Sequence, residues 1–418
     1  MEGHSSRRSF NLVAGNVSIR SFFTLTTWFV VASVVPVLGQ STAPVAEKPP
    51  NTSNRESSEL VHEVVFVRNG SRRKVAGRLL LESRDQLVLQ TDDGAIYAID
   101  QGEIQNHLQT DQVFRPATPE EIAERLLAEM PSGFRIHTTS HYVVCYGTSR
   151  TYAQWTSSLL ERLHRAFTRY WSRRGFQLHE PEFPLVALVF PDQKSYLRSA
   201  QEQGAQISSA VVGFYSLQSN RVNMYDLTGV EAVRSPGNRR GSLKEISQML
   251  SVPAAVPLVS TIVHEATHQI AFNCGLQTRL SDIPLWLCEG MAIVFEAPDL
   301  SSTKGWRGIG KVNHPRLKIF RKNQKSWRTA RLKSMLASDR PFRDSRTAAN
   351  AYADAWALNY YLIKYHPKEY TAYLKMLAQK PRLGKDGPER RLEEFHDSFG
   401  DVRKLERDFL KQMAKIKS

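Results

Sequence analysis

Cysteine is scarce in this sequence, and its scarcity excludes two classes of protein. The three cysteines among 418 residues, Cys145, Cys274 and Cys288, are too few for a disulfide-rich scaffold or for a structural metal site built from four thiolates. Cys274 and Cys288 would pair only in an oxidising compartment, and plain buried thiols are the alternative. Internal repeats are also missing, as are apolar runs beyond residue 39 that are long enough to span a bilayer.

Acidic residues are few relative to basic ones: 41 Asp and Glu stand against 56 Lys and Arg, for a net charge of +15. Most of the excess lies in a basic segment, residues 303–346, where fourteen Lys and Arg are offset only by Asp339 and Asp344. Such a segment is typical of a docking surface for an anionic polymer, membrane headgroups, an acidic peptide or nucleic acid. A solvated insertion has the same composition. No recognised nucleic-acid-binding module accompanies the charge, so we do not expect nucleic acid to be the partner.

The hydrophobic content of 41% and charged content of 23% are those of a soluble globular protein of two or three domains. At the N-terminus, three arginines precede or begin an apolar stretch, residues 22–39, that ends in small residues suited to cleavage before Gln40. We predict a signal peptide over residues 1–39 and export to the periplasm, the cell envelope or the exterior. An uncleaved anchor is the alternative, because the apolar run approaches the length of a short transmembrane helix.

The composition divides the rest of the chain into a linker and two folded parts. Residues 40–58 are rich in Pro, Ser, Thr, Glu and Asn, as in a flexible linker. Over residues 59–112, short alternating runs are separated by an Asn-Gly pair at 69–70 and an Asp-Gly pair at 93–94. These pairs are strong hairpin signals, and they predict a small all-β, SH3-like barrel. The barrel serves either as an interaction module or as a plain structural prodomain.

A linking helix is predicted within residues 113–131, because Thr118 is a suitable N-cap and Pro119 suits the first turn. The remaining residues, 132–418, mix strand-like and helical patterns and include the basic segment. The expected fold class of the chain is therefore α+β.

His264, Glu265 and His268 carry the strongest chemical signal, within a predicted helix at residues 257–274. Two imidazoles four residues apart lie on one helix face, one turn apart. This spacing lets both imidazole rings bind one metal ion, and Glu265 beside them is a candidate general base. Glu289, 21 positions after His268 on a second predicted helix, is the candidate third ligand, which leaves a fourth zinc position open for water. The sequence thus predicts a Zn²⁺ site of His264, His268 and Glu289.

Several segments resemble a known family: Leu285-Trp286-Leu287-Cys288-Glu289-Gly290-Met291-Ala292, His141-Tyr142-Val143-Val144, Gly213-Phe214-Tyr215-Ser216, Asn220-Arg221-Val222-Asn223-Met224-Tyr225-Asp226 and Tyr352-Ala353-Asp354-Ala355-Trp356-Ala357-Leu358. With the motif, the first of them resembles the gluzincin branch of the HExxH zinc metallopeptidases. The whole set is most similar to an uncharacterised family of exported bacterial proteins with a peptidase-like HExxH domain. The resemblance implies a gluzincin-like metallopeptidase domain and a peptide or protein substrate.

The sequence departs from the gluzincin pattern at one position. Some gluzincins carry an acid one turn after the ligand glutamate, where it orients a zinc histidine, and here that position is Ile293. The outer partners of the histidines are therefore unassigned, although such partners affect metal affinity and activity. Glu296, two turns after Glu289, is an alternative ligand.

The expected mechanism is hydrolysis by a zinc-activated water that attacks a peptide carbonyl. Glu265 accepts a proton from this water and passes it to the leaving amine. A further donor is needed for the oxyanion of the tetrahedral intermediate, and Tyr352 is the first candidate and Tyr225 the second. The strand pair over residues 210–225 is predicted to offer an edge to which an extended peptide adds as a strand.

Two functions of different classes fit these features. The leading hypothesis is an exported zinc-dependent endopeptidase-like hydrolase. The alternative is a non-catalytic, zinc-containing, envelope-associated protein that uses the β module and the basic segment to hold an anionic polymer. Glu265 favours the enzyme, because a structural zinc site does not need a base beside its ligands.

Overall fold

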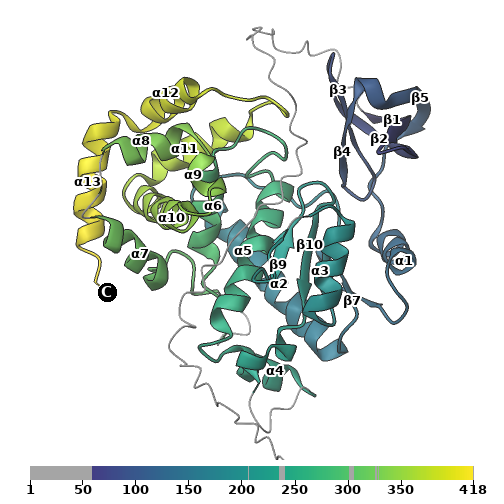
Figure 1. Ribbon diagram of the computed structural model, residues 1–418, viewed down its shortest axis with the longest axis horizontal. Helices are drawn as coiled ribbons and strands as arrows, with labels where there is room; N and C mark the ends of the chain where they lie inside the picture. The colour runs from purple at the N-terminus through teal and green to yellow at the C-terminus, as the bar shows by residue number, and fades with distance from the viewer. Residues whose placement is uncertain are drawn as a thin grey trace, which may run out of the picture.

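The computed structural model describes residues 59–205, 207–234, 241–300, 306–324, 327 and 329–417. The predicted signal peptide (1–39) and linker (40–58) lie outside these residues, and so do parts of the basic segment. Within the described residues, no helix is both long enough and apolar enough to cross a membrane. The chain has an α+β fold with a small β module at one end, a second sheet in the middle and a helical part at the other end (Figure 1).

The β module is one antiparallel sheet of five strands in the order β4-β3-β2-β1-β5. The strands are β1 (Leu60–Arg68), β2 (Ser71–Glu82), β3 (Gln86–Gln90), β4 (Ile96–Asp100) and β5 (Ile104–Val113). Asn69 and Gly70 join β1 to β2 with φ of 53° and 73°, as a two-residue type I′ hairpin requires. A small core of five fully buried side chains holds the sheet together: Val64, Phe66, Leu87, Leu89 and Ile99.

The predicted SH3-like barrel is not confirmed, because the sheet is open. Strands β4 and β5 form its two edges and do not pair with each other among the described residues. Strand β5 is absent from the predicted elements, since its sequence is polar and most of its residues are exposed. It pairs with β1 through two register irregularities, which bend the edge of a sheet.

The linking helix is confirmed as α1 (Pro119–Glu129), and Thr118 and Glu121 form a capping box at its start. Two ion pairs join this helix to the sheets on either side. Arg125 contacts Asp92 of the β module at 2.6 Å, and Glu129 contacts Arg221 of the second sheet at 2.5 Å.

The second sheet has the strand order β6-β7-β8-β10-β9. Its strands are β6 (Arg135–Thr138), β7 (Tyr142–Tyr146), β8 (Leu185–Phe190), β9 (Gly213–Tyr215) and β10 (Arg221–Tyr225). The three inner strands are parallel and the two edge strands are antiparallel to them. All six residues of β8 are apolar and buried, as expected for a strand covered on both faces. The predicted hairpin over residues 210–225 is confirmed as β9 and β10.

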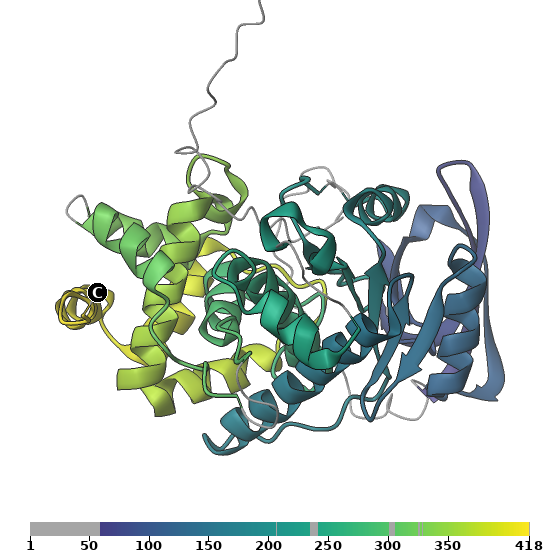
Figure 2. The same cartoon turned by 90° about the horizontal axis from the view of Figure 1, so that it is seen from below.

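Four helices come from the same part of the chain as this sheet: α2 (Arg150–Ser172), α3 (Gln193–Glu202), α4 (Leu243–Leu250) and α5 (Val256–Asn273). Helices α2 and α5 pack against each other, and α5 also packs on β9 and β10. Figure 2 shows the β module beyond this sheet, on the side away from the C-terminal helices. Helix α5 thus lies between strand β9, at one edge of the sheet, and the helical part.

The helical part consists of α6 (Leu285–Phe295), α7 (His314–Gln324), α8 (Thr329–Ala337), α9 (Arg340–Arg343), α10 (Ala348–Tyr365), α11 (Pro367–Ala378), α12 (Pro388–Phe399) and α13 (Val402–Ala414). Helices α7 to α9 belong to the basic segment. Their apolar side chains, such as Leu317, Phe320 and Phe342, are buried in the main core. The described part of the basic segment is therefore folded, and it is not the solvated insertion that its composition also allowed.

Candidate metal centre

Helix α5 holds His264 and His268 side by side in the protein interior. The helix is buried along most of its length, and the exposed fractions of the two histidines are 0% and 4%. Their Nε2 atoms are 3.1 Å apart, as the spacing of one helical turn predicts. The predicted bounds of this helix, residues 257–274, differ from the observed ones by one residue at each end.

Helix α6 brings Glu289 to the same point. Its Oε2 atom lies 3.0 Å from His264 Nε2 and 3.6 Å from His268 Nε2. The neighbouring Gly290 lets α6 approach α10 closely, since a Cβ at this position would lie 2.5 Å from the carbonyl oxygen of Ala355. Asn359 of α10 donates to the Trp286 carbonyl at 2.8 Å. Close packing of the two helices therefore fixes Glu289 opposite the histidines.

We expect Gly290→Ala to destabilise the protein, because the added methyl group meets backbone atoms of α10 that cannot rotate away. Overpacking of this kind costs about 1–3 kcal/mol, which outweighs the ~1 kcal/mol that alanine gains over glycine within a helix. Urea unfolding measures the change. Gly229→Ala is the matched control, since its Cβ would meet nothing within 4 Å. Equal stability of the two variants would contradict close packing at Gly290.

The three side chains fit a tetrahedral metal ion. One donor atom from each lies within 4.8 Å of the other two. A zinc ion with bonds of ~2.0–2.1 Å holds its ligand atoms about 3.3 Å apart, close to the observed separations of 3.0, 3.1 and 3.6 Å. Among the described residues, Glu289 Oε1 is buried without a hydrogen-bond partner. An unpartnered buried carboxylate oxygen is unfavourable unless a cation is nearby.

The pKa values of the three groups describe the centre in its ion-free form. Burial lowers the pKa of His264, but hydrogen bonds to Glu289 and Glu296 outweigh burial and raise it to about 10. Burial likewise lowers the pKa of His268, but the nearby Cys288 and Glu289 raise it to about 10. Burial raises the pKa of Glu289, and the two histidines lower it to about 2. The buried carboxylate therefore favours a proton on the histidine side of the cluster, and a bound cation would displace it.

Each histidine has an outer partner that orients its ring. His264 Nδ1 lies 3.3 Å from Glu296 Oε2, and the other oxygen of Glu296 accepts a hydrogen bond from Asn313 at 2.6 Å. This contact favours an orienting role for Glu296 over that of the alternative ligand. Glu296 can take the place that Ile293 cannot fill, because seven residues bring it to nearly the same helix face as Glu289.

The outer partner of His268 is a thiol. Its Nδ1 atom lies 3.5 Å from Cys288 Sγ, and the thiol lies 3.4 Å from Gln277 Oε1. The three cysteines are free and buried, so buried thiols are confirmed in place of a Cys274–Cys288 pair. Cys288 is the residue before Glu289. One turn of α6 therefore supplies both the carboxylate of the cluster and the thiol that contacts His268.

Glu265 lies beside the cluster and faces the sheet edge. Its Oε2 atom accepts a hydrogen bond from the backbone N–H of Tyr215 on β9, at 2.8 Å. Its exposed fraction is 8%, and burial raises the pKa of its carboxyl group. A carboxylate with a raised pKa is better suited to accept a proton near neutral pH.

Of the two predicted tyrosines, Tyr352 lies near the centre. It is buried on α10, and burial together with the charges of Glu289 and Glu265 raises its pKa. The hydroxyl of Tyr225 instead accepts a hydrogen bond from Gln193 at 3.4 Å. Sequence reasoning did not identify Tyr196 of α3, whose pKa is raised by burial and by the charge of Glu265. Among the described residues, the Tyr196 hydroxyl is buried without a partner.

Comparison with known proteins finds a family match over this part of the chain. Residues 258–384 match a family described as a protein of unknown function (DUF1570). The matched region runs from α5 to the residues that follow α11. It contains the residues proposed for the centre: His264, Glu265, His268, Glu289 and Tyr352. No curated protein matches the chain. The DUF1570 region thus coincides with the elements that build the centre, while the sheet that contributes Tyr215 lies before it.

Proposed function

We propose that the protein is an exported zinc-dependent hydrolase of the gluzincin type that cleaves peptide bonds. The observation that carries this proposal is the position of Glu265, a buried carboxylate next to two histidines and a third-ligand glutamate. A purely structural metal site has no use for such a base. His264, His268 and Glu289 would hold the zinc ion, with Glu296 and Cys288 orienting the rings.

When bound, zinc acts as a Lewis acid and lowers the pKa of a water molecule. The remaining chemistry falls to side chains of the protein. Glu265 takes a proton from the attacking water and delivers it to the leaving amine, and the Tyr215 N–H fixes the direction of its carboxylate. The hydroxyls of Tyr352 and Tyr196 are the candidate donors to the developing oxyanion. Both lie close enough to Glu265 for its charge to raise their pKa values.

The edge strand β9 is the proposed binding edge for the substrate. It is the last strand of its sheet, and its Tyr215 lies next to Glu265. A peptide that adds as a further strand would place its backbone beside the base. The five-stranded β module would act as a separate interaction domain.

Metal removal tests the proposed function. A chelator is expected to reduce hydrolysis of a mixed peptide library by the zinc-loaded full chain to background, and added zinc should restore it. Circular dichroism before and after chelation separates loss of the reaction from loss of the fold. Hydrolysis that persists after zinc has been removed from the folded protein would exclude a zinc-dependent peptidase.

The basic segment favours a second function, the binding of an anionic envelope polymer. Most of its described basic side chains are exposed, including Lys311, Lys318, Lys322, Lys333, Arg340, Arg343 and Arg346. Binding to a polyanion should weaken steeply between low and high salt, since exposed charges are screened over about 8–10 Å at physiological ionic strength. Filter binding at several salt concentrations measures this, and salt-insensitive binding would remove the proposal.

A further inference from the structure

A second group of metal-ligating side chains lies where β7, α2 and the loop before β8 meet. His141 precedes β7, His164 belongs to α2, and Glu180 belongs to the loop. One donor atom from each lies within 4.8 Å of the other two. All three residues precede the DUF1570 region, and they take no part in the centre built by α5 and α6.

His141 is held in the orientation of a metal ligand. Its Nδ1 atom lies 2.8 Å from Glu161 Oε2, while Glu161 Oε1 accepts hydrogen bonds from the His141 backbone N–H and from Thr139, both at 2.8 Å. Burial raises the pKa of Glu161, but these hydrogen bonds outweigh burial and lower it. Glu161 is therefore an ionised acceptor, and Nδ1 of His141 is the donor. This is the carboxylate–histidine arrangement found behind metal ligands.

The other nitrogen of His141 faces Glu180. The distance from Nε2 to Glu180 Oε2 is 3.1 Å, close to the ~3.3 Å that separates two ligands of one tetrahedral zinc ion. When His141 is neutral, its Nε2 lone pair faces a carboxylate oxygen. This contact is favourable only if a proton or a metal cation lies between the two atoms.

His164 supplies a second, independent indication of a ligand. Its exposed fraction is 2%, and among the described residues its Nδ1 atom has no hydrogen-bond partner. Burial lowers the pKa of His164 to about 4, so the ring is neutral and able to ligate a metal at pH 7. Its ring lies against that of His141, with centroids 4.0 Å apart and the planes tilted by 31°. Because a nitrogen lone pair lies in the plane of its ring, His164 must turn about its side-chain bonds to share an ion with His141.

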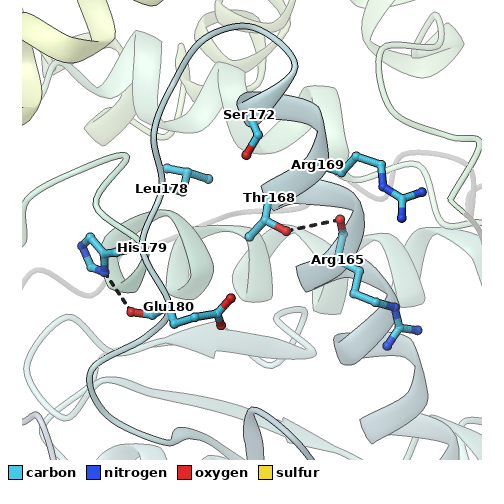
Figure 3. A pocket seen from close by; sticks show the side chains of 7 residues that line it. All are labelled: Arg165, Thr168, Arg169, Ser172, Leu178, His179 and Glu180. Atoms are coloured by element: carbon cyan, nitrogen blue, oxygen red, sulfur yellow. Dashed lines mark hydrogen bonds between the residues drawn. The ribbon is translucent and has the colours of Figure 1, made fainter.

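An ion can reach this group from the surface. The side chain of Glu180 is 78% exposed, and it borders a cleft of about 360 Å³ between the loop and α2. Figure 3 shows Glu180 and His179 on the loop across from Thr168 and Arg165 on the helix. The open side leaves room for water as a further ligand, which would make a bound ion exchangeable.

We propose that His141, His164 and Glu180 bind a divalent cation of the zinc type at a site separate from His264, His268 and Glu289. The ion would fasten the loop that joins α2 to β8 against α2 and the start of β7, near the end of α5. The loop already contacts that end, because the N–H of His179 donates to the Cys274 carbonyl at 3.2 Å. Binding to the folded state alone raises stability as the ion concentration rises.

Equilibrium dialysis of the full chain against zinc, followed by metal analysis, tests this site. The wild type is expected to bind two zinc ions per chain. Glu180→Gln and His141→Asn should each retain one, because each removes a ligand from the second site only. Neither residue is deeply buried: the side chain of His141 is 24% exposed. Both variants should therefore fold, and their circular dichroism spectra check this.

Glu182→Gln is the matched control. Glu182 is an acid of the same loop, but it pairs with Arg78 and not with the cluster. This control should still bind two ions. In the wild type and the control, the second equivalent of zinc should raise Tm, and in the two ligand variants it should not. A wild type that binds a single ion that Glu180→Gln does not remove, or variants of His141 and Glu180 that still bind two, would overturn the proposal. Glu289→Gln should retain the Glu180-dependent ion, so failure at one centre is distinguishable from failure at the other.

Discussion

Glu265→Gln is expected to lower kcat/KM for peptide hydrolysis by about 10²–10⁴-fold, the usual contribution of a general base. The variant should fold normally, because a glutamine oxygen can still accept the hydrogen bond from the Tyr215 N–H. Burial raises the pKa of Glu265, so its ionised form destabilises the fold at neutral pH. Loss of the charge should leave stability at pH 7 unchanged or slightly higher.

The test measures hydrolysis, zinc content and Tm on the same preparations of the Glu265→Gln variant and the wild type. Glu202→Gln, which neutralises an exposed acid on α3, is the control and should behave like the wild type in all three measurements. A Glu265→Gln variant that keeps its zinc and hydrolyses peptides at the wild-type rate would exclude Glu265 as the base.

The second large effect concerns metal affinity along α6. Glu289→Gln should weaken zinc binding by more than about 100-fold, because it removes a ligand, and even the outer partners of ligands contribute about 10–100-fold. Glu296→Gln should fall within that lower range, since Glu296 reaches the ion only through His264. Ile293→Val should leave the affinity unchanged, although it removes a buried methyl group and costs about 0.5–1.5 kcal/mol of stability.

Competition with a chromophoric chelator measures the three zinc affinities. The proposed roles predict a specific order of zinc affinities. Glu289→Gln should bind zinc most weakly, Glu296→Gln should be intermediate, and Ile293→Val should bind zinc as tightly as the wild type. If Glu296→Gln proved as damaging as Glu289→Gln, Glu296 would be a ligand itself. If Glu289→Gln bound zinc as tightly as the wild type, the third ligand would be another group.

The local parts of the centre were predictable from the sequence. The positions of His264, Glu265 and His268 on one helix follow from the helical repeat, and helix α5 ends within one residue of its predicted bounds. The Asn-Gly turn at residues 69–70 was also predictable, because it depends on the φ preferences of two adjacent residues. Placing Glu289 at the cluster required the spacing along the chain and a family resemblance in addition to periodicity.

The remaining parts depend on contacts between distant segments. Asn313 reaches Glu296 from outside α6, and no local pattern marks it. Tyr196 was missed because α3 is a largely polar helix with only two buried residues. The surroundings of Tyr225 also depend on α3, since its hydroxyl accepts a hydrogen bond from Gln193 of that helix. The barrel was expected from short strands and turns, which determine hairpins but not whether the two edge strands of a sheet, here β4 and β5, pair with each other.

Anomalous X-ray diffraction at the zinc edge, from crystals of the full chain grown with zinc, shows directly whether the three side chains hold one ion. We expect an anomalous peak about 2.0–2.2 Å from His264 Nε2, His268 Nε2 and a carboxylate oxygen of Glu289. Zinc-loaded crystals with no peak between these three side chains, or with zinc bound there without Glu289, would contradict it.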